Sequence, residues 1–70
     1  MGDYRETAAI RGVEVRRATE KALLCIIDDE EIWIPKSQLD DESELTEGSD
    51  EGDFGVLVIP QWLADEKGIG

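Results

Sequence analysis

Two continuous apolar runs are the strongest pattern in this chain. Residues 22–27 and 54–59 are apolar or glycine throughout, and six positions are too few for a typical helix. Such runs are typical of strands that are buried on both faces. Before the first run, Val13 and Val15 alternate with charged residues, as in a strand with one buried face. The pattern therefore predicts at least three strands.

A further strand follows an acidic turn. Asp28–Glu31 is a run of four carboxylates, short enough to connect the first apolar run to Ile32 as a hairpin. Ile32 and Ile34 should then share one face of the strand, with Trp33 on the other. Pro35 is expected to end the strand, because proline has no N–H for the next ladder hydrogen bond.

Short helical segments complete the expected fold. Residues 36–39 are expected to make one helical turn that brings the last of them, a leucine, onto the core. Pro60 suits the first turn of a helix and Gly68 its C-terminal cap, with Trp62 and Leu63 as core anchors between them. The expected fold class is mainly β with one short C-terminal helix. Its architecture would be a small, strongly bent sheet or an open SH3-like or OB-like barrel of about four strands.

Composition divides the chain into parts. Residues 1–11 show no clear period and are expected to be a loose lead-in, whereas residues 12–70 form a single small domain. Within that domain, residues 40–53 hold eight acids, two glycines and one leucine. We expect a solvated acidic loop there, because so little of it is apolar.

The chain is small and has few means of covering its apolar strands. A domain of 70 residues is expected to be marginally stable, and association of several copies is a common remedy. The two runs apolar on both faces need more cover than one helix of about two turns. We therefore expect a homo-oligomer, in the form of a two-fold dimer that buries residues 26–34.

The charge is strongly negative and unevenly distributed. The net charge is −11, and residues 28–70 contain fourteen acidic and two basic side chains. Such a surface opposes direct binding to nucleic acid or anionic lipid, because phosphate contacts need lysine and arginine. The single cysteine excludes an internal disulfide, and no apolar run has membrane-spanning length, so the cytoplasm is the expected location and no membrane is expected.

Catalytic and metal chemistry find little support in the sequence. There is no histidine, which excludes Ser-His and Cys-His nucleophile pairs. Cys25 lies inside an apolar run and is expected to be an inert thiol. The carboxylates lie on turns and a polar loop, without the shelter that raises a catalytic pKa, and the loop lacks the ligand spacing of an EF-hand. We expect no enzyme activity, no cofactor and no metal site.

A few residues are candidates for specific recognition. Trp33 is expected to be buried on the second face of the sheet, and the alternative is an exposed stacking platform or interface anchor. Lys36 and Ser37 follow Pro35 and are expected to lie in a solvated turn, and the alternative is a donor pair at the mouth of the barrel. Arg16 and Arg17 are adjacent on a strand, so they should point to opposite faces. The acidic partner surface is expected to comprise Asp28, Asp29, Glu30, Asp40, Asp41, Glu42 and Glu44.

Several segments together resemble a known group of proteins. The segments are residues 19–25, 32–39, 52–59, 62–64 and 67–69, of which Trp-Ile-Pro-Lys-Ser-Gln (33–38) is the most distinctive. They resemble small uncharacterised proteins of bacteriophages and prophages over roughly residues 13–69. That group has no assigned activity, so the resemblance implies a phage accessory protein acting in the host cytoplasm and transfers no functional residue.

Two binding mechanisms suit such a protein, and both would counter a host defence system. In the first, the acidic surface blocks a basic groove of a host protein. In the second, an oligomer sequesters a small nucleotide signal, with Arg16, Arg17, Lys21 and Lys36 gathered around it and Trp33 stacked on its base. The alternative to both is an unspecified interaction module of phage replication or assembly.

Overall fold

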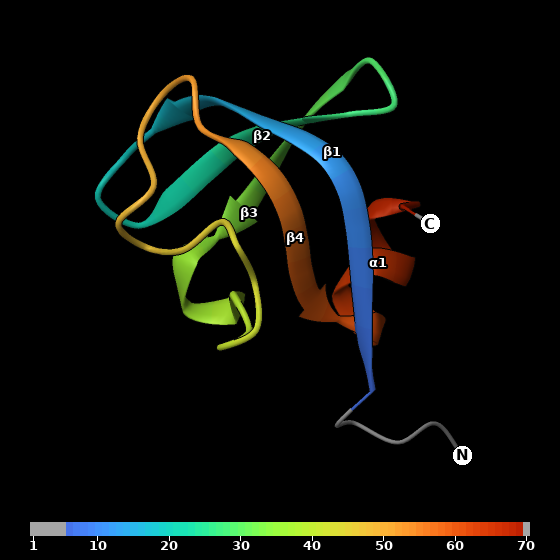
Figure 1. Ribbon diagram of the computed structural model, residues 1–70. Coiled ribbons are helices and arrows are strands. Elements are labelled where there is room, and N and C mark those ends of the chain that lie inside the picture. Colours follow the sequence, from blue (N-terminus) through green and yellow to red (C-terminus); the bar gives the residue numbers. More distant parts are fainter. Residues whose placement is uncertain (1–5, 70) are drawn as a thin grey trace.

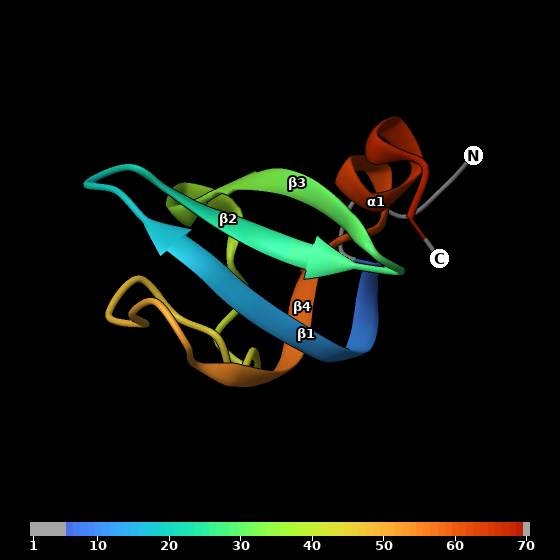
Figure 2. The same cartoon turned by 90° about the horizontal axis from the view of Figure 1, so that it is seen from above.

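Within residues 6–69, which the computed structural model describes, four strands form one antiparallel sheet in the order β3-β2-β1-β4 (Figure 1). The elements are β1 (Thr7–Ala18), β2 (Ala22–Ile27), β3 (Glu30–Pro35), the 3-10 turn η1 (Lys36–Gln38), β4 (Phe54–Pro60) and α1 (Gln61–Lys67). The sheet is bent but does not close on itself, as the view from above shows (Figure 2). The predicted fold class, mainly β with a short C-terminal helix, is confirmed.

Strand β1 is the long, bent strand that joins the two halves of the sheet. Its first part pairs with β4 and its last part with β2. Two β-bulges interrupt these ladders, one between Ile10 and Val13 and the other between Val15 and Arg17. Gly12 lies in the first bulge with φ of +70°, a conformation that favours glycine. Because a bulge bends its strand, β1 can turn from one half of the sheet to the other.

The predicted lead-in over residues 1–11 is wrong for residues 7–11, which are the first part of β1. Ala8 and Ile10 are half-buried there and pack against the core. Their small or isolated apolar side chains give little periodicity in the sequence, and the segment becomes a strand through its pairing with β4 far along the chain. Residues 1–5 of the expected lead-in lie outside the described residues.

The hairpin between β2 and β3 turns in fewer residues than the sequence suggested. Glu30 pairs with Ile27, so only Asp28 and Asp29 form the connection. Both have positive φ, 51° and 66°, as a type I′ hairpin turn requires, and aspartate tolerates this region better than most residues. Glu30 and Glu31 therefore belong to the strand and not to the turn.

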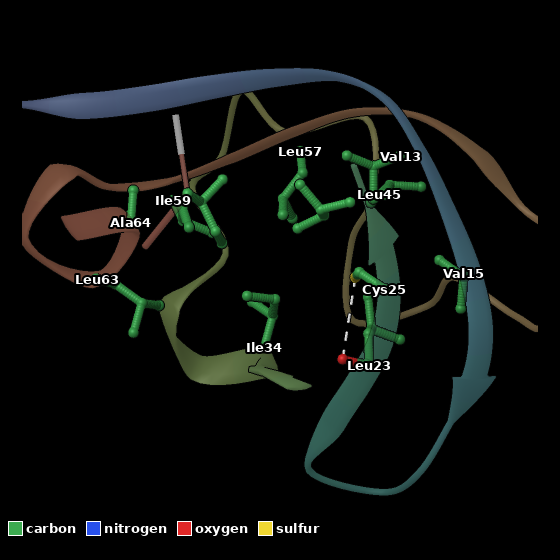
Figure 3. Close-up of a cluster of buried hydrophobic side chains, with 12 residues drawn as sticks. Val13, Val15, Leu23, Cys25, Ile34, Leu45, Leu57, Ile59, Leu63 and Ala64 are labelled. Atoms are coloured by element: carbon green, nitrogen blue, oxygen red, sulfur yellow. Dashed lines mark hydrogen bonds between the residues drawn. The ribbon is translucent and has the colours of Figure 1, made fainter. Parts of the chain in front are cut away.

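The core fills the concave side of the sheet (Figure 3). Its strand residues alternate as predicted, with Ile34 opposite Leu23 and Val15 opposite Cys25. On the outer face, away from this core, Leu24 is also nearly buried, as expected for a run apolar at every position. The buried cluster comprises Val13, Val15, Leu23, Cys25, Ile27, Ile34, Leu45, Leu57, Ile59, Leu63, Ala64 and Ile69.

The acidic loop is not the freely solvated segment that its composition suggested. Leu45, its only leucine, is 2% exposed and lies among the core side chains beside Leu57 and Val13 (Figure 3). Ser43 and Ser49 are buried as well. One large apolar side chain, with serines that hydrogen-bond to the backbone, is enough to hold the loop on the sheet. Before it, Leu39 packs against the core as predicted.

Helix α1 packs against β1 and β4 at one end of the sheet. Leu63 and Ala64 are buried, but Trp62 is 49% exposed, so its prediction as a core anchor is wrong. In a helix of seven residues only one narrow face can reach the sheet. Gly68 ends the helix with φ of +74°, as predicted, and its neighbour Ile69 donates its N–H to Ala64 and returns to the core.

Candidate functional site

The acidic loop (residues 40–53) lies along the edge of β4 that no strand covers. The backbone N–H groups of Asp40 and Glu44 donate to the carbonyls of Val58 (2.9 Å) and Val56 (2.9 Å). The Ser43 hydroxyl accepts the N–H of Val58 at 3.0 Å. The loop therefore takes the place of a neighbouring strand, which is one way in which proteins protect a sheet edge.

Glu44 completes this edge with its side chain. Its Oε1 accepts the N–H of Val56 at 2.8 Å. A Cβ atom at Gly55 would lie only 2.7 Å from that oxygen, so a larger residue there would displace the carboxylate from this position. Glu44 was predicted to belong to the partner surface. It is exposed, and its carboxylate also serves the fold, since it holds a backbone donor of β4.

The remaining carboxylates of the loop divide into two groups. The Asp40 carboxylate accepts the N–H of Glu42 at 3.0 Å, and that of Asp53 accepts the N–H of Asp50 at 2.9 Å, so both stabilise turns within the loop. Five others are exposed and receive no hydrogen bond from the described residues. These outer carboxylates belong to Asp41, Glu42, Glu47, Asp50 and Glu51.

Lys36 lies beside this acidic surface. It is half-buried and borders a shallow hollow of about 280 Å³, together with Asp41 and Glu47 of the loop. Its backbone N–H donates to the carbonyl of Lys21, which fixes the start of η1. Ser37 is exposed in the same 3-10 turn. Lys36 of the possible donor pair is therefore set against carboxylates, an arrangement that does not suit an anionic ligand.

The second acidic group lies at the tip of the β2–β3 hairpin. Asp28, Asp29, Glu30 and Glu31 are all exposed. This tip and the acidic loop lie on different sides of the molecule (Figure 1), so the predicted acidic residues do not form one continuous patch. Among the described residues one ion pair is present, Arg16 Nε to Glu31 Oε2 at 3.9 Å. Both side chains are more than half exposed, and such pairs contribute little stability.

The outer face of the sheet brings together three of the predicted recognition residues. Arg17 pairs with Leu24, and Leu24 pairs with Trp33, so these three follow one another across that face. Arg16 reaches Glu31 on the same face. The prediction that Arg16 and Arg17 point to opposite faces is wrong, because the bulge between Val15 and Arg17 breaks the alternation.

Trp33 is 44% exposed, so the favoured prediction of burial is wrong for the single chain. Alternation places it opposite Ile32 and Ile34 as expected, but no described segment covers the face on which it lies. Its neighbour across the ladder, Leu24, is only 7% exposed. The Trp33 side chain therefore shields Leu24 with one part, and its other part is exposed to solvent.

Two further exposed aromatic residues were not singled out as surface residues from the sequence. Phe54 is 71% exposed and pairs with Glu14 on the outer face, with its ring over Gly12. Trp62 projects from the free side of α1. The sequence signal for Phe54 was its position at the start of a strand directly after the acidic loop, where alternation places it opposite the buried Leu57 and Ile59.

The one cysteine of the described residues lies in the core. Burial raises the pKa of the Cys25 thiol to about 11, which makes it a poor nucleophile near neutral pH. Its Sγ donates a weak hydrogen bond to the Leu23 carbonyl at 3.9 Å (Figure 3). In the described part of the chain, no three histidine, cysteine or acidic side chains are placed to hold one metal ion.

Comparison with protein-family models, with curated proteins and with solved structures found no match for this chain. The resemblance to phage proteins thus remains a prediction from the sequence. No helix among residues 6–69 is long and apolar enough to cross a membrane.

Proposed function

We propose that the protein is a non-enzymatic phage accessory protein that counters a host defence system by binding a basic groove of a host protein with its acidic loop. The observation that carries the proposal is the docking of the loop. Leu45 anchors it in the core, and Ser43 and Glu44 bind it to the edge of β4. The outer carboxylates are thus held on a fixed backbone.

Fixed carboxylates favour binding for a physical reason. A disordered acidic segment would lose conformational freedom on binding, and that cost opposes association. Here the loop is already ordered in the free chain, so less remains to be ordered when a partner binds. Complementary charge would speed the encounter and would favour basic partners over others.

The partner is better described as a basic protein groove than as a site that mistakes the loop for DNA. An extended chain spans at most about 3.5 Å per residue, so eight acids in fourteen residues give about one charge per 6 Å. Duplex DNA carries about one charge per 1.7 Å. The loop is too sparsely charged to imitate a duplex, but it suits a groove lined by a few lysine or arginine side chains.

Affinity capture from host cells followed by direct binding tests this proposal. The immobilised full chain should retain a host protein, which mass spectrometry then identifies and which is purified for titration. Its binding should weaken as salt rises, because rim charges are screened. A chain that retains no host protein in defence-competent cells, or whose binding is indifferent to salt, would count against the proposal.

A second candidate function has one observation in its favour. The bulge in β1 places Arg17 on the same face as Trp33, with Leu24 between them in the ladder. An aromatic surface beside a guanidinium suits a stacked, phosphate-bearing nucleotide. Sequestration of such a signal predicts that cyclic nucleotides or ADP-ribose derivatives raise the melting temperature of the unmodified protein. Lys36 lies apart, beside the acidic loop, which weakens this candidate.

A further inference from the structure

The two edge strands of the sheet differ in whether another segment hydrogen-bonds to them. The acidic loop hydrogen-bonds to the free edge of β4, as described above. Strand β3 is the other edge, and no hydrogen bond from another described segment reaches the N–H or carbonyl groups of Glu31 and Trp33. Helix α1 packs mainly against β1 and β4. An open edge is a template for pairing with another strand.

The hairpin geometry fixes which groups point outward from β3. In a hairpin with a two-residue turn, Ile27 and Glu30 next to the turn exchange hydrogen bonds, and every second pair does the same. Glu31, Trp33 and Pro35 fall at the alternate positions, so their backbone groups face away from β2. Pro35 lacks an N–H, and it stands where β2 would not have used one.

We propose that two copies of this chain join their β3 strands antiparallel, about a two-fold axis at Trp33. Trp33 would exchange two backbone hydrogen bonds with the Trp33 of the second copy. The N–H of Glu31 would donate to the carbonyl of the second copy's Pro35, and the symmetric bond would form as well. The result is a continuous sheet of eight strands across the dimer.

Charge favours this register over those with the axis at Glu31 or Ile32. With the axis at Trp33, Glu30 of each copy lies opposite Lys36 of the other, so two pairs of opposite charge form. An axis at Glu31 would place two carboxylates directly opposite each other, which is unfavourable. An axis at Ile32 would place Glu30 opposite the buried Ile34 without a partner for its charge.

The side chains along the edge favour a second copy as the occupant. Trp33 is half-exposed, and Ile32 beside it is only partly buried. In the proposed register the two Trp33 side chains meet on the outer face. A two-fold interface needs such self-complementary pairs. Edge charges and proline also discourage pairing in many proteins. Here Glu30 and Lys36 have partners of opposite charge in the second copy, and the carbonyl of Glu31, opposite Pro35, is the one outward group of the paired segment that gains no donor.

Sedimentation equilibrium of the full chain, with charge reversal, tests the proposal. The unmodified chain should have twice its 7.8 kDa monomer mass at high micromolar concentration. Glu30→Lys and Lys36→Glu should each weaken dimerisation by about tenfold or more, because each turns both attractive pairs into repulsive ones. The double variant Glu30→Lys/Lys36→Glu should recover the dimer, since it restores both pairs in reversed order.

Circular dichroism of each variant checks that it is folded. Lys36→Gln provides a second test that adds no carboxylate beside the acidic loop. Lys36→Gln should weaken the dimer less than Lys36→Glu does. A chain that stays monomeric at all concentrations overturns the proposal. A dimer indifferent to both single reversals, or not recovered in the double variant, also overturns it. The dimer test changes Glu30 and Lys36 and leaves the outer carboxylates in place, so failure of the dimer and failure of the proposed function are separate results.

Discussion

Glu44 Oε1 accepts the backbone N–H of Val56 at 2.8 Å, so a side chain of the acidic loop satisfies the free edge of β4. This relationship separates the structural carboxylates of the loop from those that are available to a partner. Gly55 leaves room for this hydrogen bond, because a Cβ there would meet the same carboxylate.

Removing the Glu44 carboxylate is expected to destabilise the fold. Glu44→Ala should lower the free energy of unfolding by about 1–2 kcal/mol, since the Val56 N–H loses a charged acceptor that is itself partly in water. Glu44→Gln should lose less, because the amide oxygen can still accept. Urea unfolding gives these values, with Glu47→Ala as the matched control at about 0.5 kcal/mol or less. Equal losses for Glu44→Ala and Glu47→Ala would contradict the assignment.

Leu45 is expected to be the anchor of the acidic loop. Leu45→Ala should cost about 2–5 kcal/mol, as for other buried leucines. In the variant, the loop amides should also exchange with deuterium faster than in the unmodified chain, and this increase should exceed that of the β2 amides, because the loop loses its only large contact with the core. Hydrogen exchange by mass spectrometry measures this. Unchanged exchange over residues 40–53 in the variant would show that the loop does not depend on Leu45.

Trp33 is expected to affect folding only modestly in the single chain. Because the side chain is 44% exposed, Trp33→Ala should lower the free energy of unfolding by about 1–2 kcal/mol. The control is Ile34→Ala in the same strand, which should cost about 2–5 kcal/mol because Ile34 is buried. Both are measured at protein concentrations low enough to keep the chain monomeric. A loss at Trp33 as large as that at Ile34 would mean that another segment covers this face.

The buried thiol is expected to make stability fall in alkaline solution. Burial raises the Cys25 pKa from 9.0 to about 11. Between these pH values the thiol is ionised in the unfolded chain but protonated in the folded one. Unfolding then releases a proton and becomes more favourable as pH rises. The loss should be on the order of 2 kcal/mol by pH 11.

Comparison with Cys25→Ala isolates this contribution. The variant keeps all other groups that titrate in alkaline solution, so only the difference between the two stability curves reports the thiol. The curves should be parallel below pH 8 and should converge between pH 9 and pH 11. Curves that stay parallel throughout would show that the thiol is not buried in the folded chain.

The parts of the fold that local pattern determines were predictable. Continuous apolar runs predicted strands β2 and β4, and alternation predicted which face of the sheet Ile34 lies on. Gly68 predicted the end of α1. Long-range pairing was not predictable in this way. The start of β1 depends on β4, and the bulge that turns Arg16 and Arg17 to one face leaves no mark in local periodicity.

The candidate site shows the same division. Composition identified residues 40–53 as an acidic loop, but an average over fourteen residues hides the effect of a single leucine in the core. Nor does the sequence distinguish Glu44, which serves the backbone of β4, from Glu42 and Glu47, which do not. The exposure of Trp33 depends on what covers one face of the sheet, and alternation states only which face that is.

Neutralising the outer carboxylates tests the account's central claim that the ordered acidic loop is the binding surface. The loop variant is Asp41→Asn/Glu42→Gln/Glu47→Gln/Glu51→Gln, which leaves Asp40, Glu44 and Asp53 in place for the fold. The control variant changes four exposed glutamates elsewhere to glutamine and thus alters the net charge equally. These glutamates are Glu6, Glu14, Glu20 and Glu66.

The measurement is the dissociation constant of each variant for the captured host protein, by titration calorimetry at two salt concentrations. The loop variant should bind about tenfold or more weakly and with a flatter salt dependence, because four rim charges each contribute a fraction of a kcal/mol. The control variant should bind like the unmodified chain. Equal weakening of both variants, or unchanged binding of the loop variant, would contradict the claim.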